Sequence, residues 1–371
     1  MFDDADRARM AEALHLAGRG MFTTTPNPRV GCVIVAGGEV VGRGHHERAG
    51  GPHAEAVALA EAGARARGAT AYVTLEPCTH HGRTPPCVDA LCAAGIARVV
   101  VAATDPNPIA GRGADRLRER GVRVDVGLLA AEAEALNCGF VSRLTRGRPW
   151  VRMKIAASLD GRTALAGGAS QWITSAEARR DGHAWRARAC AVLTGIGTVR
   201  EDDPRLDVRD LETPRQPLKV LVDSRLEASP HARLFAGGRV LVASAVEDAV
   251  RRGAIEARGA EVVVLPNEGG KVELAALMAE LARRELNEIH VEAGHKLNAS
   301  LLAAGLVDEL LVYLAPSVIG DSGRGMFALP PPAGLEERVP LAFTEVIRVG
   351  PDLRILARLQ GGTWSGLQRA S

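Results

Sequence analysis

Aromatic residues are scarce in this 371-residue sequence, and neither sign of charge dominates. Phe, Trp and Tyr together make up 3% of the residues, and the formal net charge is +2, with basic and acidic residues interspersed. Proteins that bind nucleic acid usually need stacking aromatic side chains or a basic stripe that neutralises phosphates. We therefore expect no nucleic-acid partner.

The sequence also lacks a long apolar segment. No run approaches the ~20 apolar residues of a membrane-spanning helix, and the opening MFDDADRARM lacks the basic and apolar regions of a signal peptide. We expect a cytoplasmic protein without a membrane partner. Thiols stay reduced in that compartment, so paired cysteines among the six are expected to be metal ligands or catalytic groups rather than disulfides.

A third absence concerns nucleotide binding. No G-x-G-x-x-G motif follows an expected strand, and the best partial match, Gly195-Ile-Gly197, continues to Arg200 where the motif needs glycine. A Rossmann dinucleotide site is therefore not supported.

The length of the chain and the alternation of its apolar segments predict two α/β domains. A chain of this length exceeds the size at which one hydrophobic core usually keeps growing. Expected strands and helices alternate in both halves, which is typical of layered α/β domains, and we expect a largely parallel sheet in the first. Because the short basic segment 145–149, TRGRP, separates the halves, we place the domains at residues 1–146 and 147–371.

The expected elements follow from apolar runs of strand length and apolar residues at helical spacing. In the first half, helices are expected at 8–17, 53–67, 88–94 and 114–120, and strands at 30–35, 72–75, 99–102 and 122–126, with a turn at Gly37-Gly38. In the second half, strands are expected at 150–155, 191–193, 219–222, 240–243, 262–265, 289–291 and 310–314. The turn-rich segment 201–217 is expected to be a functional loop.

One group of residues carries recognisable chemistry. His53 and Glu55 open an alanine-rich helix, and Cys78, preceded by proline, and Cys87 follow. This is the order of zinc deaminases, in which one His and two Cys bind the metal and the Glu moves protons. Three protein ligands leave the fourth zinc position open for the attacking water. We expect His53, Cys78 and Cys87 to bind one Zn²⁺ and Glu55 to be catalytic.

The spacing of the two cysteines departs from the usual C-x-x-C. The segment THHGRTPP, residues 79–86, separates Cys78 from Cys87. This loop carries His80, His81 and Arg83 beside the expected metal. Such side chains suit an anionic substrate group, most simply a phosphate.

Two less specific interpretations of this group stay open. The cysteine pair could form a disulfide, although a reducing compartment disfavours it. The group could also be a closed structural zinc site with His46, His80 or His81 as fourth ligand, although such a site does not require Glu55. We interpret the remaining cysteines as small core residues: Cys32, Cys92, Cys138 and Cys190.

The sequence resembles the bifunctional deaminase/reductases of riboflavin biosynthesis over nearly its whole length. The segments that carry the resemblance are TPNPRVG (25–31), HAEAVAL (53–59), TLEPCTHHGRTPPC (74–87), DPNP (105–108), MKIAASLDGRTA (153–164), SQWITS (170–175) and VEAGHKLNASLLAAGLVDEL (291–310). The resemblance implies an N-terminal cytidine-deaminase-like α/β/α sandwich and a C-terminal α/β domain similar to dihydrofolate reductase.

The resemblance implies two consecutive reactions on one small phosphorylated pyrimidine. The first is the zinc-dependent hydrolytic deamination of 2,5-diamino-6-ribosylamino-pyrimidinone 5'-phosphate. In the second, NADPH reduces the ribosyl chain to give 5-amino-6-ribitylamino-uracil 5'-phosphate. We also expect the protein to form a homo-oligomer, specifically a dimer.

Matching motif positions give the residues that the resemblance implies at each site. The deaminase substrate would contact Asn27, His46, His80 and Arg83. NADPH would contact Ala156, Trp172, Thr198, Asp202, Ser224 and Gly294. The reductase substrate would contact Lys154, Ser170, Arg186, Leu206, Arg209 and Glu292. Independently of the resemblance, the chain passes from an expected strand at Glu292 through Gly294 into a helix whose first N–H groups could hold a pyrophosphate. Taken alone, such a junction is a weak indication. Asp160 has a structural alternative as a turn residue.

Other functions stay open at this point. A nucleoside- or tRNA-type zinc deaminase with a degenerate or nucleotide-sensing C-terminal domain would share the metal site, but a tRNA enzyme predicts the basic, aromatic surface that this composition lacks. A zinc-stapled scaffold is a third possibility. Turnover distinguishes all of these, whereas metal content does not.

Overall fold

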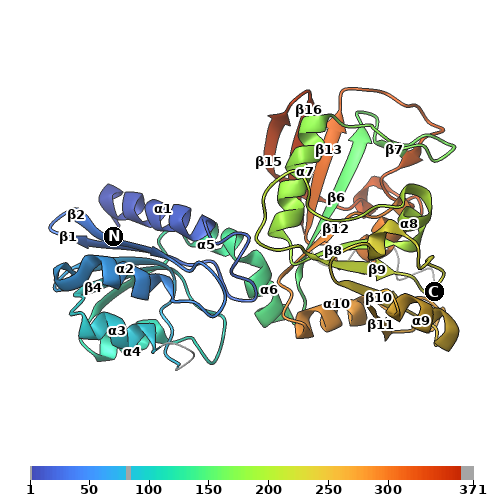
Figure 1. The fold of residues 1–371 in the computed structure, drawn as a ribbon. Coiled ribbons are helices and arrows are strands. Elements are labelled where there is room, and N and C mark those ends of the chain that lie inside the picture. The colour runs from blue at the N-terminus through green and yellow to red at the C-terminus, as the bar shows by residue number, and fades with distance from the viewer. Residues whose placement is uncertain (1, 81–84, 361–371) are drawn as a thin grey trace. The chain divides into compact units, whose positions relative to one another are not determined.

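The computed structural model describes residues 2–80 and 85–360, and the chain divides into two compact units, Met1–Gly147 and Arg148–Ser371. Each unit is an α/β layer structure built on its own sheet, as expected (Figure 1). Within the described residues, no helix is both long enough and apolar enough to cross a membrane.

The first unit is built on a mixed five-stranded sheet. Its strands lie in the order β2 (Glu39–His45), β1 (Gly31–Ala36), β3 (Thr70–Leu75), β4 (Arg98–Ala103) and β5 (Arg123–Val126). The last three are parallel, whereas β1 pairs antiparallel with both β2 and β3. The expectation of a largely parallel sheet is therefore wrong on this side. Gly37 and Gly38, both at positive φ, close a two-residue hairpin that makes β1 and β2 antiparallel.

Helices cover both faces of this sheet (Figure 1). One face carries α1 (Asp4–Gly18), α5 (Ala130–Leu136) and α6 (Cys138–Arg146). The other carries α2 (Ala54–Ala62), α3 (Cys87–Ala93) and α4 (Gly113–Glu119). The helix expected at 53–67 ends earlier because Gly63 takes a positive φ of 55°, and a 3-10 turn, Gly63–Ala66, follows it.

The second unit contains a nine-stranded sheet. Its strands lie in the order β11 (Ala260–Val264), β10 (Val240–Ser244), β9 (Leu218–Val222), β8 (Ala191–Gly195), β12 (Glu288–Val291), β6 (Trp150–Ser158), β13 (Glu309–Ala315), β16 (Asp352–Leu359) and β15 (Leu341–Val349). All neighbours from β11 to β13 are parallel, and β16 and β15 add an antiparallel hairpin. The expected strands of this half all coincide with observed ones, but the sequence did not predict the β15–β16 hairpin.

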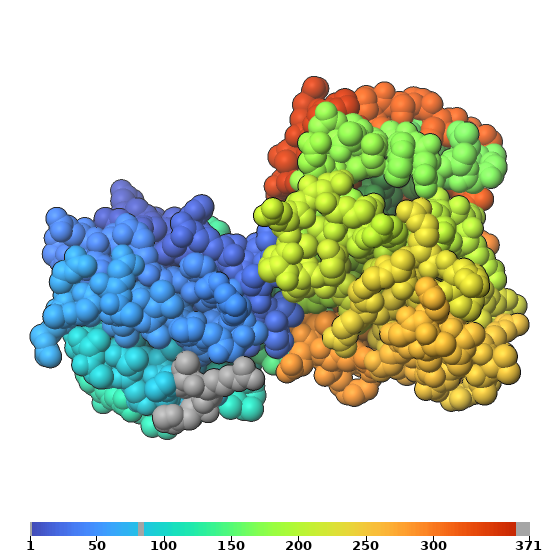
Figure 2. Space-filling view, in the orientation of Figure 1, coloured from blue at the N-terminus to red at the C-terminus, as the bar shows by residue number. Residues whose placement is uncertain are grey.

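Two groups of helices enclose this sheet. On one face, α10 (Leu274–Arg283) and α11 (His295–Ala303) pack on the main core cluster. On the other face lie α7 (Ala176–Arg188), α8 (Ile196–Asp202) and α9 (Ala249–Glu256). A short pair, β7 (Arg162–Ala164) and β14 (Arg324–Gly325), forms a separate two-stranded sheet, and 3-10 turns occur at Arg233–Phe235 and Leu335–Glu337. Figure 2 shows the surface of this unit hollowed between its green and yellow segments.

Charged side chains are buried beneath α7. Arg152 on β6 is 2% exposed and pairs with Glu288 on β12 at 3.1 Å and with Glu309 on β13 at 2.5 Å. Its guanidinium also lies 4.5 Å from the centre of the Trp185 ring on α7. Removing one partner of such a buried pair leaves an uncompensated charge, so these contacts fix β6, β12 and β13 relative to α7.

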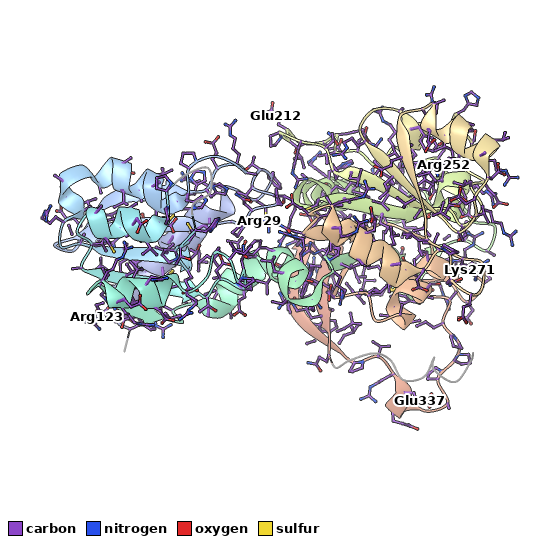
Figure 3. The ribbon with its side chains drawn as sticks, turned by 90° about the horizontal axis from the view of Figure 1, so that it is seen from below. Arg29, Arg123, Glu212, Arg252, Lys271 and Glu337 are labelled. Atoms are coloured by element: carbon purple, nitrogen blue, oxygen red, sulfur yellow. The ribbon has the colours of Figure 1, made fainter. Side chains whose placement is uncertain are left out.

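Arg29, which is labelled in Figure 3, connects the segment before β1 to the junction between α5 and α6. Its side chain is buried and donates to Leu136 O at 2.6 Å and to Met21 O at 3.4 Å. Its backbone exchanges two hydrogen bonds with the Asn137 side chain. The segment just before β1, which contains Asn27, is therefore held from both sides.

Helix α2 lies very close to β2 because β2 carries glycine at the contact. A Cβ added at Gly42 would lie 2.2 Å from Ala58 O, and one added at Gly44 would lie 2.1 Å from Ala54 O. Both distances are far below van der Waals contact with the helix backbone. The two glycines thus set the position of the first turn of α2, which carries Glu55.

Replacing Gly44 by Ala should displace α2 and destabilise the first unit by about 2–3 kcal/mol, because an added methyl group in a packed contact forces the backbone apart. The four tryptophans all lie beyond residue 147, so tryptophan fluorescence reports only the second unit. We expect calorimetry to show the fluorescence-silent transition lowered by roughly 5 °C or more.

Gly18→Ala is the matched control, since Gly18 ends α1 and has no atom within 4 Å of its added Cβ. Its transition should stay at or slightly above that of the unmodified protein. Equal midpoints for Gly44→Ala and Gly18→Ala would contradict the close-approach argument.

Candidate active sites

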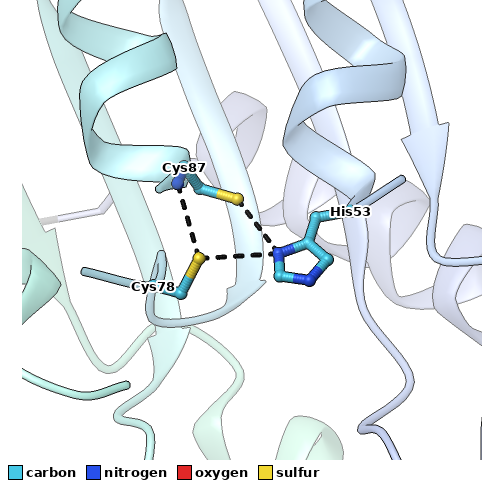
Figure 4. Close-up of side chains that lie close together, drawn as sticks. All are labelled: His53, Cys78 and Cys87. Carbon is cyan, nitrogen blue, oxygen red and sulfur yellow. Dashed lines mark hydrogen bonds between the residues drawn. The ribbon is translucent and has the colours of Figure 1, made fainter. Parts of the chain in front are cut away.

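Three ligand groups from different segments converge in the first unit. His53 caps the start of α2, Cys78 lies in the loop after β3, and Cys87 is the first residue of α3. His53 Nδ1 lies 3.2 Å from Cys87 Sγ and 3.5 Å from Cys78 Sγ (Figure 4). All three ligand atoms lie within 4.8 Å of one another. Two thiols and one imidazole at this separation suit a tetrahedral zinc ion with one position left for water.

Hydrogen bonds within this group shift the pKa values of the two thiols in opposite directions. The Cys87 thiol, and after it His53, hydrogen-bond Cys78 and lower the pKa of Cys78 to about 4. The same contact with Cys78 raises the pKa of Cys87, and the Cys87 N–H also points to Cys78 Sγ at 3.4 Å. One thiolate is thus formed readily by the protein alone, and a bound divalent cation would favour the second.

Glu55 lies in the first turn of α2, two residues after His53. Its side chain is 3% exposed, and burial raises its pKa, while the thiol of Cys87 lies within hydrogen-bonding reach. A buried carboxyl whose pKa is raised holds a proton more readily than an exposed one, which suits a group that must both take up and release a proton. The structure therefore brings together all four residues that the sequence predicted for the metal site.

Asn27 and His46 form a pair whose hydrogen bonds define their orientation. His46 is 3% exposed, and its Nδ1 lies 2.9 Å from Pro52 O, which can only accept. Nδ1 therefore carries the proton, and burial lowers the pKa of His46, which favours the neutral ring with Nε2 as an acceptor. Nε2 lies 3.0 Å from Asn27 Nδ2, so the amide must present its NH₂ group to His46. Within the described residues, Asn27 Oδ1 has no hydrogen-bond partner and is left for a ligand.

The DPNP segment, residues 105–108, is hydrogen-bonded to the residues just before Cys78. Glu76 accepts hydrogen bonds from the N–H groups of Asp105, at 3.1 Å, and Ala114, at 2.8 Å. A Cβ on Gly113 would lie 1.8 Å from Pro77 O, so only glycine permits this contact. Glu76 was not among the residues predicted from the sequence, although its place directly before Pro77-Cys78 was the available indication.

The loop between the two cysteines is described only in part. His80 lies at its start, and its Nδ1 is buried without a hydrogen-bond partner in the described part of the chain. His81 and Arg83 lie outside the described residues.

Two adjoining cavities occupy the second unit. The larger, of about 850 Å³, lies at the carboxyl ends of β8, β9 and β12, where Gly195, Ser224 and Gly294 line it. The smaller, of about 230 Å³, begins at β6 with Lys154 and Ala156. The residues that line both cavities are Thr198, Glu201, Gly294, His295 and Arg324. Ligands of open α/β sheets bind at this edge, and the two volumes together suit a dinucleotide beside a small substrate.

The positions expected for NADPH all line one of these cavities. Ala156, Trp172 and Asp202 line the smaller one, and Ser224 lines the larger. Thr198 and Gly294 line both. Trp172 is 69% exposed and stacks on Arg179, whose guanidinium carbon lies 4.5 Å from the ring centre.

The positions expected for the reductase substrate fall into two groups. Lys154, Ser170 and Glu292 line the smaller cavity. The others line neither cavity and gather around Asp207: Arg186, Leu206 and Arg209. Arg186 joins the groups, because it donates to Glu292 at 2.9 Å and to Asp207 O at 2.9 Å.

Lys154 and Glu292 both line the smaller cavity, and their surroundings lower the pKa of each. Burial would raise the pKa of Glu292, but the Arg186 guanidinium outweighs it and holds that pKa well below its usual range. Burial lowers the pKa of Lys154, whose ammonium lies 5.9 Å from the centre of the Tyr313 ring. The cavity thus offers a fixed carboxylate and a lysine that loses its proton more easily than an exposed one.

Asp160 plays a structural part at the end of β6. Its carboxylate accepts from Ser158 Oγ at 2.5 Å and from the N–H groups of Gly320, at 2.7 Å, and Ile319, at 3.1 Å. These bonds lower its pKa to about 2 and anchor the segment that follows β13. Asp160 lines neither cavity.

Comparison with known proteins finds a matching family for each of the two units. The family described as the cytidine and deoxycytidylate deaminase zinc-binding region matches residues 3–103, and the RibD C-terminal domain matches residues 149–355. The chain is 49% identical to the riboflavin biosynthesis protein RibD of Escherichia coli (strain K12) over 362 residues, which cover 94% of this chain and 98% of that protein. It is 44% identical to RibD of Haemophilus influenzae over 367 residues, which cover 95% and 97%.

Solved structures agree over both units. Acinetobacter baumannii RibD, form 1, is 39% identical with a TM-score of 0.88, and the match covers 96% of this chain and 99% of that one. A Thermotoga maritima protein described as a diaminohydroxyphosphoribosylaminopyrimidine deaminase/5-amino-6-(5-phosphoribosylamino)uracil reductase is 32% identical with a TM-score of 0.87 and the same coverage. The family that the sequence resembled is thereby confirmed. The chain belongs to the RibD family of riboflavin biosynthesis proteins, which join a deaminase and a reductase in one polypeptide.

Proposed function

We propose that the two units catalyse consecutive steps on one phosphorylated pyrimidine. The first unit releases ammonia from 2,5-diamino-6-ribosylamino-pyrimidinone 5'-phosphate, and the second reduces the ribosyl chain of the product with NADPH. The observation that carries the proposal is the convergence of His53, Cys78 and Cys87 beside the buried Glu55. The description of the Thermotoga maritima relative supports the substrate.

The deaminase residues have distinct tasks. His53, Cys78 and Cys87 would hold one zinc ion, since two thiolates offset its charge. When bound, zinc activates water for hydrolysis near neutral pH. Glu55 would take one proton from the attacking water and deliver it to a pyrimidine ring nitrogen. It would then pass the proton of the newly attached hydroxyl group to the amino group, which leaves as ammonia when the C–N bond breaks. Its burial and raised pKa support this role.

Asn27 orients the pyrimidine, and His46 positions Asn27. Because His46 Nε2 takes the NH₂ of Asn27, the free Oδ1 accepts from an N–H group of the substrate, which an aminopyrimidine offers. Both ring nitrogens of His46 are hydrogen-bonded to protein groups, so His46 acts through Asn27 rather than on the substrate. His80, whose buried Nδ1 has no hydrogen-bond partner among the described residues, and Arg83 are proposed to bind the phosphate.

The reductase half binds the cofactor across the carboxyl edge of its sheet. The glycines at 195 and 294 let a dinucleotide approach the backbone, and NADPH, when bound, supplies the hydride. The ribose, opened as an aldehyde or imine, would receive it at the anomeric carbon. Lys154 and Glu292 lie where they can hold that sugar, and Arg186 keeps Glu292 in place.

If the second unit were degenerate, the protein would release ammonia from the substrate but would not oxidise NADPH. The two adjoining cavities, lined by every position expected for NADPH, favour an active reductase. A homodimer stays a prediction.

Zinc-loaded protein given the diaminopyrimidinone ribotide should release ammonia without NADPH. Nicotinamide absorbance should then fall only after deaminated product has formed, because the reductase substrate is that product. Ammonia release and absorbance at 340 nm, followed in one cuvette, check the order. Ammonia without NADPH oxidation would leave the deaminase proposal intact and remove the reductase one.

Glu55→Gln should lower the rate of ammonia release by roughly 10²- to 10⁴-fold, the usual contribution of a general acid–base group. The amide keeps the shape of the side chain but cannot carry the proton, so zinc content by atomic emission should stay at one per chain. Glu61→Gln, an exposed position on the same helix, should retain nearly full activity. Normal deamination by Glu55→Gln would remove the assigned role.

The tautomer of His46 can be checked without turnover. Nitrogen-15 NMR of the zinc-loaded protein should show His46 protonated at Nδ1 and unprotonated at Nε2 at neutral pH, with exposed His15 as internal reference. Asn27→Asp places a carboxylate against that lone pair, so kcat/KM for deamination should fall by roughly 10- to 100-fold with zinc retained. A proton on Nε2 in the unmodified protein would contradict the assigned orientation of Asn27.

A further inference from the structure

A fully buried histidine lies directly behind the carboxylate of Glu292. His290 on β12 is 0% exposed and lines neither cavity, whereas Glu292, two residues later, lines the smaller one. Within residues 2–80 and 85–360, neither ring nitrogen of His290 has a hydrogen-bond partner. Buried polar groups are normally paired, so an unpaired imidazole beside a residue expected at a substrate site points to a role there.

Charged groups on β6, β12 and α7 surround this imidazole. Arg152, its register partner on β6, is buried and pairs with Glu288 at 3.1 Å. Arg186 on α7 pairs with Glu292. Burial lowers the pKa of His290; Glu292 acts in the opposite direction, and the charges of Arg186 and Arg152 add to the lowering. The neutral ring is therefore favoured, and a neutral imidazole carries one N–H group.

Glu292 favours one position for that hydrogen. His290 Nε2 lies 3.4 Å from Glu292 Oε1, just beyond the usual length of a hydrogen bond. Arg186 holds the pKa of Glu292 well below its usual range, and an ionised carboxylate can only accept. An Nε2–H group facing this carboxylate is therefore more stable than a lone pair facing it. Hydrogen bonds of this kind are often long without substrate and shorten in the complex.

Arg186 and His290 together leave one oxygen of Glu292 open. Arg186 donates through Nε to Oε1 and through Nη2, at 2.9 Å, to Oε2. Each carboxylate oxygen has two acceptor positions. Oε1 has both Arg186 and His290 next to it, whereas no second donor in the described part of the chain reaches Oε2. The open acceptor position of this carboxylate is therefore at Oε2.

We propose that His290 is a positioning residue of the reductase, which occupies Oε1 of Glu292 so that Oε2 alone accepts from a hydroxyl group of the opened ribosyl chain. The inference rests on the proposed function, in that the smaller cavity must hold that chain. His290 acts through Glu292, since it does not line the cavity itself. A carboxylate fixed in one orientation holds the sugar in one orientation toward the cofactor, which speeds hydride transfer.

The test compares His290→Gln with His290→Met in the full chain, using deaminated ribotide prepared beforehand without NADPH. Gln can place an amide N–H near the position of Nε2, whereas Met fills the space without a donor. We expect His290→Met to lower kcat/KM for the ribotide in the reduction by roughly 10- to 100-fold, mainly in kcat, with the KM for NADPH unchanged. His290→Gln should recover most of this loss.

Two controls separate positioning from a general loss of stability. Ammonia release by the first unit should be the same in every variant, because His290 belongs to the second unit. Ile289→Val removes a methyl group from the preceding residue of β12, which is fully buried in the core under α10 and α11. It should lower the unfolding midpoint, followed by tryptophan fluorescence, by about 2–4 °C and leave kcat and KM of the reduction unchanged.

Nitrogen-15 NMR checks the tautomer without turnover. At neutral pH one histidine, missing from the spectrum of His290→Gln, should be protonated at Nε2 and unprotonated at Nδ1, the reverse of His46. A proton on Nδ1, an equal loss in His290→Gln and His290→Met, or a normal kcat in His290→Met would overturn the inference while the proposed function stands. If the unmodified protein oxidises no NADPH with the deaminated ribotide, the reductase proposal fails and the inference falls with it.

Discussion

The metal site of the first unit depends on how closely α2 approaches β2. Gly42 and Gly44 present no Cβ to the helix, so backbone meets backbone there. That contact fixes the start of α2 and therefore the position of His53 relative to the cysteine loop. Ligand atoms must be held within a few tenths of an ångström for a metal to bind well, and rigid elements achieve this better than loops. Glu76 supports the loop that carries Cys78 from the opposite side.

In the second unit, buried ion pairs rather than close backbone contacts hold the elements in position. Arg186 and Glu292, 106 positions apart in sequence, form an ion pair at the wall of the smaller cavity. Burial raises the pKa of Glu292, but the Arg186 guanidinium outweighs this effect and holds the pKa well below its usual range. The pair of Arg152 with Glu288, stacked under Trp185, continues this polar layer beneath α7. Helix α7 takes part in both, because it carries Arg186 of the first pair and Trp185, which stacks on Arg152 of the second.

The larger cavity of the second unit, proposed to hold the dinucleotide, is formed without a glycine-rich motif. In a Rossmann fold one loop supplies the phosphate contacts, and a short pattern in the sequence reveals it. Here the ends of three parallel strands contribute separately, with Gly195 after β8, Ser224 after β9 and Gly294 after β12. The missing motif therefore excludes a Rossmann site but not a dinucleotide site.

The sequence alone determined the features that neighbouring residues encode. The spacing of His53, Glu55, Cys78 and Cys87, the two α/β halves and the strands of the parallel sheet were all predictable, because helical turns, caps and apolar runs are local. The β15–β16 hairpin and the mixed first sheet were not, since pairing depends on partners far along the chain. Only the tertiary structure decided that His46 lies against Asn27, and that Arg186 and Glu292, 106 positions apart, form one ion pair. No periodicity records such contacts, because their geometry exists only once the sheet has assembled.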